Sequence, residues 1–513
     1  MRNYRRLALI LTIYLGTFIA TLDISIVNVA LPQIQTDLQT SISGLQWVVD
    51  IYALCLSAFI LSAGPIGDRY GRKLSWLIGV GVFIAGSVIC GIAENLTVLL
   101  AGRAVQGVAG ALLIPGALSI LVHAFPDKRE RAHIIGGWTS FSAISLVVGP
   151  ILGGILVETA GWASIFFINV PIGLFAIAIG TWAIKESAHP DHAAFDPLGQ
   201  IASMLALGLL TFGLITAGEA GWKSGHTFFP LLGAAIAFIV FLAVEHRVER
   251  PLLPLGLFRN AEFSMMNAIA FMIGFSTFNN VFFLSLFFQR AQGLSPAETG
   301  WRMAPEFVAM GAVSILSGYL CSRLGTRQVI VTGGTVIAAS LLLMGLFAGG
   351  ISYLYLAFLL AGLGIGIGLV VPASSAALMA SVPAERSGMA SATMNTLRQA
   401  GMTIGIALLG SIMGSQALRS LTARLEETGI GNAADIAEAA IIRHDLTGGG
   451  LPGNSLGQLA NRAFAEGIER AMLVAGAIAV IVTLAFVWTH YVKQPIRSSS
   501  PGQAAAETDT IST

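Results

Sequence analysis

Five ionisable side chains interrupt the long apolar stretches of this chain, namely Asp23, Asp50, Arg103, Glu306 and Arg398. A charged side chain at the centre of a membrane costs about 2.5–3.5 kcal/mol or more unless it faces protein or water. Each of the five is therefore a candidate functional residue. Their types suit proton transfer and the binding of charged molecules.

Asp23 and Arg103 could form a proton-responsive pair. Burial disfavours the charged form of a carboxylic acid, so Asp23 could take up and release a proton near neutral pH. A guanidinium keeps its charge and needs a partner or water. If Arg103 neighbours Asp23, its pairing changes whenever that carboxylate releases its proton. The alternatives are a structural hydrogen bond for Asp23 and a structural ion pair for Arg103.

Asp50 and Glu306 are candidate substrate-binding acids. Trp47 precedes Asp50 by three residues, so the two side chains share a helix face. A carboxylate beside an indole ring attracts a lipophilic cation. Alternatively, Asp50 faces water at the membrane edge, and the residues leave both interpretations open. Glu306 is a weaker candidate of the same kind, and Arg398 is expected to pack between helices.

A charged, glycine-rich decapeptide, Gly64–Lys73, separates two apolar stretches and has an echo at Gly318–Arg327, where Ser322 replaces the acid. Its candidate gating residues are Gly64, Asp68, Arg69, Gly71 and Arg72. With an offset of 257, glycines 107 and 153 match glycines 364 and 410, and prolines 115 and 372 also match. These echoes predict two copies of one membrane unit, an arrangement that places a substrate site between the halves.

Another glycine-rich run lies inside the fifth apolar stretch and contains Gly149, Pro150, Gly153 and Gly154. Small residues let helices approach closely, and proline kinks a helix. The run suits a hinge or seal, with ordinary small-residue packing as the alternative.

The composition places the chain in a membrane. It has 513 residues, of which 55% are hydrophobic and 11% charged, with net charge +1 and mean hydropathy +0.79. A soluble protein would be about a quarter charged. The net charge argues against nucleic-acid binding. Three cysteines in or beside apolar stretches indicate neither disulfides nor a metal site, and no catalytic or nucleotide motif predicts an enzyme or a cofactor.

The apolar stretches predict an all-α membrane protein with fourteen spans of about 20 residues each. They cover 8–31, 45–65, 74–93, 97–122, 134–156, 162–184, 198–218, 227–245, 262–288, 301–321, 328–349, 352–376, 391–416 and 471–492. We expect a six-helix bundle over 1–184, two inserted helices with flanking loops over 185–261, and a second six-helix bundle over 262–492. Residues 418–470 form an outer loop or a capping helical hairpin, and 493–513 a disordered tail.

Lys and Arg are unequally distributed between the loops on the two sides of the membrane. With the N-terminus inside, the short outer loops hold only Lys223, Arg290 and Arg302 among the basic residues. This bias predicts that both termini are cytoplasmic.

As a set, Leu22–Pro32, Gly64–Lys73, the Arg103–Gly107 run, the Gly149–Gly154 run and Phe166–Gly173 resemble the fourteen-span drug:proton antiporter branch of the major facilitator superfamily, the EmrB/QacA type. The resemblance covers about residues 1–495. It implies a major facilitator fold in the plasma (inner) membrane.

The resemblance also implies roles. Asp23 would couple transport to protons and Arg103 would modulate it; Gly149, Pro150, Gly153 and Gly154 would be the antiporter signature; Asp68 and Arg72 would belong to the gate; Asp50 would favour cations. An acid that some relatives use in span 13 has no match here.

The leading hypothesis is a monomeric, proton-coupled multidrug exporter of lipophilic cations that works by alternating access. An exporter of a single endogenous or antibiotic-like metabolite is the alternative. A substrate-gated channel or receptor is a third class, which the confinement of Asp23 and Arg103 to one half argues against.

Overall fold

The computed structural model of the chain describes residues 2–188, 196–248, 253, 255–347, 352–383, 387–428, 430, 432–442 and 453–492. All regular secondary structure in these residues is helical.

The first half of the chain and the inserted pair form nine helices in the described residues. They are α1 (Arg2–Asp37), α2 (Ile42–Tyr70), α3 (Arg72–Gly91), α4 (Leu96–Ala124), α5 (Lys128–Ala160), α6 (Ser164–Phe167), α7 (Asn169–Ala183), α8 (Pro197–Ala220) and α9 (Gly225–Arg247).

The second half starts with a short 3₁₀ segment and a helix with two π-helical segments. Its elements are η2 (Leu255–Arg259), α10 (Ala261–Ile273), η3 (Gly274–Phe278), α11 (Asn279–Leu286), η4 (Phe287–Ala291), α12 (Pro296–Leu324), α13 (Thr326–Phe347), α14 (Tyr353–Ala380), α15 (Ser387–Glu427), α16 (Ala433–Ile442), α17 (Gly453–Val487) and η6 (Trp488–Val492).

Helices cover the described parts of all fourteen predicted spans. Thirteen of them in the described residues are long and apolar enough to cross a membrane. The remaining predicted span lies in α5, a helix of 33 residues in which Ile144–Ala160 is the apolar part. A helix satisfies most of its backbone polar groups within itself, as lipid requires.

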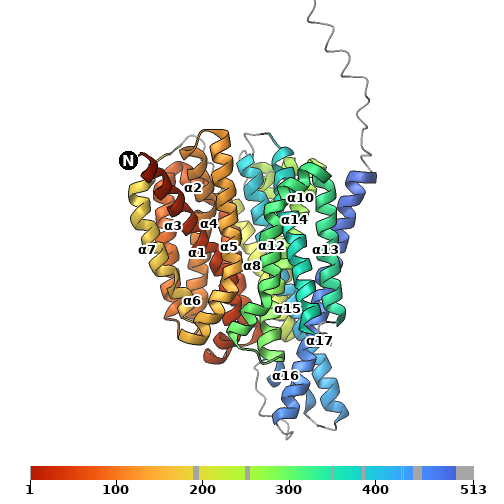
Figure 1. Ribbon diagram of the computed structural model, residues 1–513. Coiled ribbons are helices and arrows are strands. Elements are labelled where there is room, and N and C mark those ends of the chain that lie inside the picture. The colour runs from red at the N-terminus through yellow and green to blue at the C-terminus, as the bar shows by residue number, and fades with distance from the viewer. Residues whose placement is uncertain are drawn as a thin grey trace, which may run out of the picture.

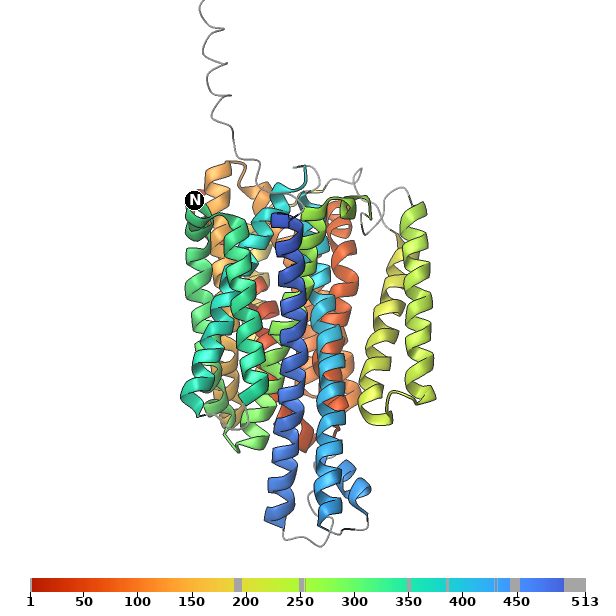
Figure 2. The same cartoon turned by 90° about the vertical axis from the view of Figure 1, so that its right-hand side faces the viewer.

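The two halves lie side by side, α1–α7 beside α10–α17 (Figure 1). The inserted pair α8 and α9 stands at one edge of the molecule (Figure 2). Helix α8 is tied to both halves: Gln200 donates a hydrogen bond to the Ala58 carbonyl of α2 (2.5 Å), and Gly218 packs against Ser411 of α15. The inserted pair therefore covers the seam between α2 and α15.

The sequence repeat recurs as repeated geometry. Gly71 ends α2 with φ +107° and Gly325 ends α12 with φ +87°, backbone conformations that favour glycine. Gly107 of α4 packs against the backbone of Tyr52 in α2, and Gly364 of α14 packs against the backbone of Glu306 in α12. The same close helix crossing thus occurs once in each half.

The segment 418–470, which the sequence left open between a loop and a hairpin, is helical in its described residues. Helices α15 and α17 extend past the bundle, and α16 packs beside them (Figures 1 and 2). Arg424 of α15 forms an ion pair with Glu466 of α17, and the apolar side of α16 is buried at Ala437 and Ile441. We call this end of the molecule the α16 side and the opposite end the N-terminal side.

Candidate functional site

The structure brings Asp23 and Arg103 into direct contact. Asp23 lies in α1 and is fully buried, and Arg103 in α4 is 1% exposed. The Arg103 Nη1 donates to Asp23 Oδ2, which makes the pair both an ion pair and a hydrogen bond. A buried pair of this kind is costly to break on one side only, because the remaining charge loses its partner.

Further polar groups surround this pair, and the sequence did not assign a role to most of them. Gln106 donates to Asp23 Oδ1 (3.1 Å) and to Ser87 Oγ (2.8 Å), and Asn169 also donates to Ser87 (3.3 Å). Gln106 accepts from Arg103 Nη1 (2.9 Å). Gln106 and Asn169 lie in the Arg103–Gly107 and Phe166–Gly173 runs that carried the family resemblance. No pattern in the sequence pointed to Ser87.

Arg103 is also held by α2. Its Nε donates to the Val48 carbonyl (3.0 Å), and its guanidinium lies 4.5 Å from the centroid of the Tyr52 ring. Tyr52 in turn donates to the Ala20 carbonyl of α1 (3.1 Å). Protonation of Asp23 would remove the charge that Arg103 faces, so the change would reach α1, α2 and α4 together.

The glycines of the α5 run lie against α1 next to the Asp23 turn. A side chain at position 149 would collide with Ser25, and one at position 153 would come within 2.6 Å of Ile26 Cγ1. These glycines therefore set the close approach of α5 to the helix that carries Asp23.

The same run meets the second half of the molecule. A side chain at Gly154 would lie 2.7 Å from the Ala297 Cα of α12, and a side chain at Gly300 of α12 would collide with the Pro150 carbonyl of α5. We call these contacts of Gly154 and Gly300 the α5–α12 interlock. The interlock lies on the α16 side. Gly300 is a residue that sequence reasoning missed, because only the packing shows that it faces the run.

The α5–α12 interface loosens away from the interlock. Gly311 and Gly318 follow Gly300 by about three and five helical turns, so they keep roughly the same face. A Cβ at Gly311 would have one neighbour, at 3.9 Å, and a Cβ at Gly318 none within 4 Å. In the described residues, α12 thus packs tightly against α5 near Gly300 and loosely near Gly311 and Gly318.

Asp50 lies in the seam between the two halves. Gln46 and Ser57, which share its helix face, donate to the α15 carbonyls of Ile406 (2.8 Å) and Thr396 (3.4 Å). Asp50 is fully buried, and neither carboxylate oxygen has a hydrogen-bond partner among the described residues. A buried carboxylate left without a partner needs an explanation, such as a proton or a cationic ligand.

Trp47 turns from that seam toward the inserted pair. Its ring centroid lies 6.3 Å from that of Phe212 in α8, and Trp47 also packs against the buried cluster of Leu214, Ile215 and Ala407. The sequence predicted a shared face for Trp47 and Asp50, but not that α8 supplies the facing aromatic ring.

Glu306 lies inside the second half, away from Trp47. It is 2% exposed and accepts a hydrogen bond from Asn280 Nδ2 (3.1 Å). Asn280 is the second residue of α11, which directly follows the π-helical segment η3, and such segments often accompany functional sites. Nothing in this geometry joins Glu306 to Asp50 in one site.

The decapeptide loop contacts the linker to the inserted pair. Glu186 accepts hydrogen bonds from the backbone of Lys73 and Leu74 (both 3.0 Å), so its carboxylate caps the N-terminus of α3. Arg72 N donates to the Ser187 carbonyl (3.0 Å). A Cβ at Gly71 would lie 2.7 Å from Glu186 Cδ. No pattern in the sequence pointed to Glu186.

The other residues of the loop are less constrained. Arg69 is exposed and lies 5.6 Å from the Tyr70 ring centroid. Gly64 and Asp68 lie in α2, and their side-chain surroundings fall outside the described part of the structure.

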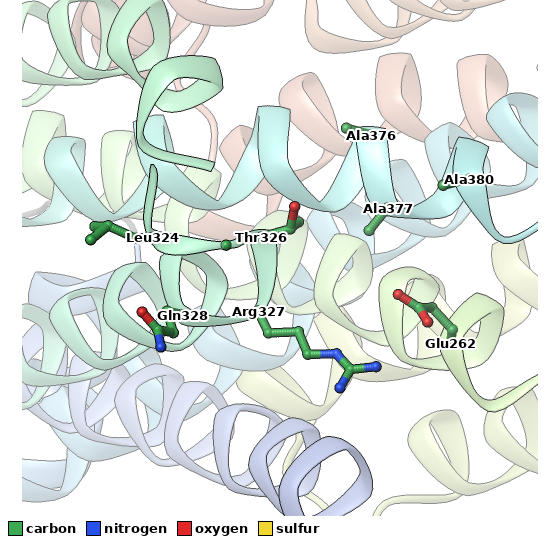
Figure 3. Close-up of a pocket in the computed structure, with 9 residues that line it drawn as sticks. Glu262, Leu324, Thr326, Arg327, Gln328, Ala376, Ala377 and Ala380 are labelled. Atoms are coloured by element: carbon green, nitrogen blue, oxygen red, sulfur yellow. The ribbon is translucent and has the colours of Figure 1, made fainter. Parts of the chain in front are cut away.

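A pocket in the second half is lined by Glu262, the turn Leu324–Gln328 and three alanines of α14 (Figure 3). It lies at the repeat of the decapeptide loop, and none of the five charged candidates from the apolar stretches lines it. It is therefore not the site that the sequence predicts.

Comparison with known proteins agrees with this architecture. The profile of the Major Facilitator Superfamily matches residues 13–406. The chain is 34% identical to multidrug resistance protein Stp of Mycobacterium tuberculosis, over 94% of this chain and 92% of that protein. It is 32% identical to the tetracenomycin C resistance and export protein of Streptomyces glaucescens, over 97% and 93%.

The fold is also shared with a solved structure. A peptide transporter crystallised with sulfate superimposes with a TM-score of 0.60 at 15% identity, over 93% of this chain and 94% of that one. The fold, the profile match and the full-length relatives together show that this chain belongs to the major facilitator superfamily.

Proposed function

We propose that the chain is a proton-coupled multidrug efflux transporter that exports lipophilic, cationic compounds by alternating access. Its relatives are named for multidrug resistance and for antibiotic resistance and export, which supports efflux. The observation that carries proton coupling is the fully buried Asp23–Arg103 pair with its Gln106 bond. The protein acts as a monomer in the plasma membrane, with both termini in the cytoplasm.

In this mechanism the N-terminal side is cytoplasmic and the described conformation is closed on the outer, α16 side. Substrate enters between the halves from the cytoplasm. Opening of the α5–α12 interlock lets the substrate leave to the outer face and exposes Asp23 there, where it takes a proton and frees Arg103. Return to the closed form and loss of the proton to the cytoplasm restore the ion pair, so one cycle exchanges substrate for protons.

Export of a single metabolite is the second candidate. Relatives named for resistance to one antibiotic, such as methylenomycin A in Bacillus subtilis (34% identical), favour it. In that case Asp50 has no role in cation selection.

Replacing Asp50 with asparagine separates these functions. We expect Asp50→Asn to weaken export of a quaternary ammonium dye by about tenfold or more, because a desolvated carboxylate attracts a cation strongly. A neutral substrate should be spared. The measurement is efflux from a pump-deficient host at matched expression, with Glu94→Gln, which changes an exposed acid, as the control.

Equal loss of cationic and neutral substrates would make Asp50 structural or part of the coupling machinery, and would favour the single-metabolite exporter. Unchanged export of both would contradict a substrate role.

A further inference from the structure

The pocket in Figure 3 repeats a site that a carboxylate occupies in the first half. Residues 254 apart correspond in the two copies of the glycine-rich decapeptide, so Lys73 corresponds to Arg327. In the first half, the backbone N–H groups of Lys73 and Leu74 donate to the carboxylate of Glu186. The start of a helix attracts anions in this way because its first N–H groups have no partners within the helix.

In the second half, no side chain from the described residues takes the place of Glu186. Helix α13 begins at Thr326, and no side chain within the described ranges accepts a hydrogen bond from the backbone or the guanidinium of Arg327. A pocket of about 490 Å³ lies at this turn, a size typical of small-molecule sites. The N-terminus of α13 thus borders a pocket where that of α3 binds a carboxylate.

The pocket carries charges of both signs. Arg327 extends from α13 toward the side of the pocket on which Glu262 of α10 lies (Figure 3). Both side chains are partly exposed, and the ion pairs within the described residues include neither of them. A guanidinium fork beside helix N–H groups suits a phosphate, and the carboxylate across the pocket suits an ammonium group.

The pocket lies at the edge of the membrane. Helix α12 runs from the α16 side at Gly300 to the N-terminal side at Leu324, and Leu324 lines the pocket. Leu316 and Leu324 are 53% and 54% exposed, and their spacing continues one apolar side of the helix as far as the pocket. Exposed leucines on a membrane-spanning helix contact lipid tails, which are equally apolar.

We propose that this pocket binds the headgroup of phosphatidylethanolamine from the leaflet on the N-terminal side. The phosphate lies on Arg327 and the start of α13, the ammonium group donates to Glu262, and the acyl chains follow Leu324 into the membrane. Phosphatidylglycerol has only hydroxyl groups for Glu262 and carries a net negative charge that this carboxylate repels. The site uses none of the buried charges of the proposed transport cycle, so the inference does not depend on the exported substrate.

Lipid titrations on purified full-length protein in detergent test the proposal, with bound lipid measured by native mass spectrometry. Wild-type protein should bind phosphatidylethanolamine more tightly than phosphatidylglycerol. Arg327→Gln should weaken binding of both lipids by about tenfold or more, because each loses a charge-assisted contact to its phosphate. Glu262→Gln should weaken phosphatidylethanolamine but strengthen phosphatidylglycerol, since it removes an attraction in the first case and a repulsion in the second.

Arg323→Gln is the matched control, because Arg323 lies one turn before Arg327, is exposed and does not line the pocket. It should leave both affinities unchanged. Soluble phosphoethanolamine and inorganic phosphate distinguish the sources of the phosphate. If either competes at the concentration at which the lipid itself binds, the pocket takes a soluble phosphate compound and the assignment to a lipid is wrong.

Thermal unfolding of each variant, measured in parallel, shows whether a loss of binding reflects a loss of folding. The proposal is overturned if folded Arg327→Gln binds phosphatidylethanolamine as the wild type does, or if Glu262→Gln changes the two lipids in the same direction. If Arg327→Gln does not fold, the opposite effects expected of Glu262→Gln still decide the question.

Discussion

Replacing Asp23 with asparagine should reduce efflux driven by a pH gradient to the level of cells that lack the transporter, for cationic and neutral substrates alike. Asparagine fits the space and keeps one acceptor oxygen in place of the two that accept from Arg103 and Gln106, but it cannot titrate. The ion pair with Arg103 would be lost, so Arg103 would face a neutral partner throughout the cycle. The measurement is substrate-induced pH change in proteoliposomes.

A matched variant controls for this substitution. Asp37→Asn makes the same change at the exposed end of the same helix and should leave transport intact. Because Asp23→Asn keeps the side-chain volume but leaves Arg103 buried without its ion-pair partner, membrane insertion and substrate binding of the variant are measured alongside transport. If its vesicles show the wild-type pH change on addition of substrate, Asp23 does not couple transport to protons.

A second large effect is expected at the α5–α12 interlock. Gly300→Val would push a branched side chain into the Pro150 carbonyl. Overpacking of this kind costs about 1–3 kcal/mol, which corresponds to a roughly five- to hundredfold shift toward the state that is open on the α16 side. Transport should fall strongly, because alternating access needs both states.

Cysteine labelling measures that shift. Thr299 is fully buried beside Gly300, so a cysteine there should react with an impermeant maleimide from outside only when the interlock opens. Gly300→Val should raise this labelling, whereas Gly318→Val, on the open part of the same interface, should leave it low. Unchanged labelling in Gly300→Val would show that the interlock does not seal the α16 side.

The sequence predicted the helices, their membrane class and the repeat, because these depend on local physics. A run of about 20 apolar residues must become a helix in lipid, and Gly71 and Gly325 mark the turns that only glycine adopts easily. Because a charged side chain is costly in lipid, the sequence alone also identified Asp23, Asp50 and Arg103 as candidate functional residues.

Only the tertiary structure decided which of these residues meet. Asp23 and Arg103 are 80 positions apart, and nothing local fixes whether two interior charges form a pair or face separate neighbours. The Gln106–Ser87–Asn169 bonds and the Gly300–Pro150 contact likewise depend on how helices cross. Asp50 lies at the seam between the halves because α2 and α15 pack antiparallel there, a geometry set by long-range packing that no local pattern in either helix encodes.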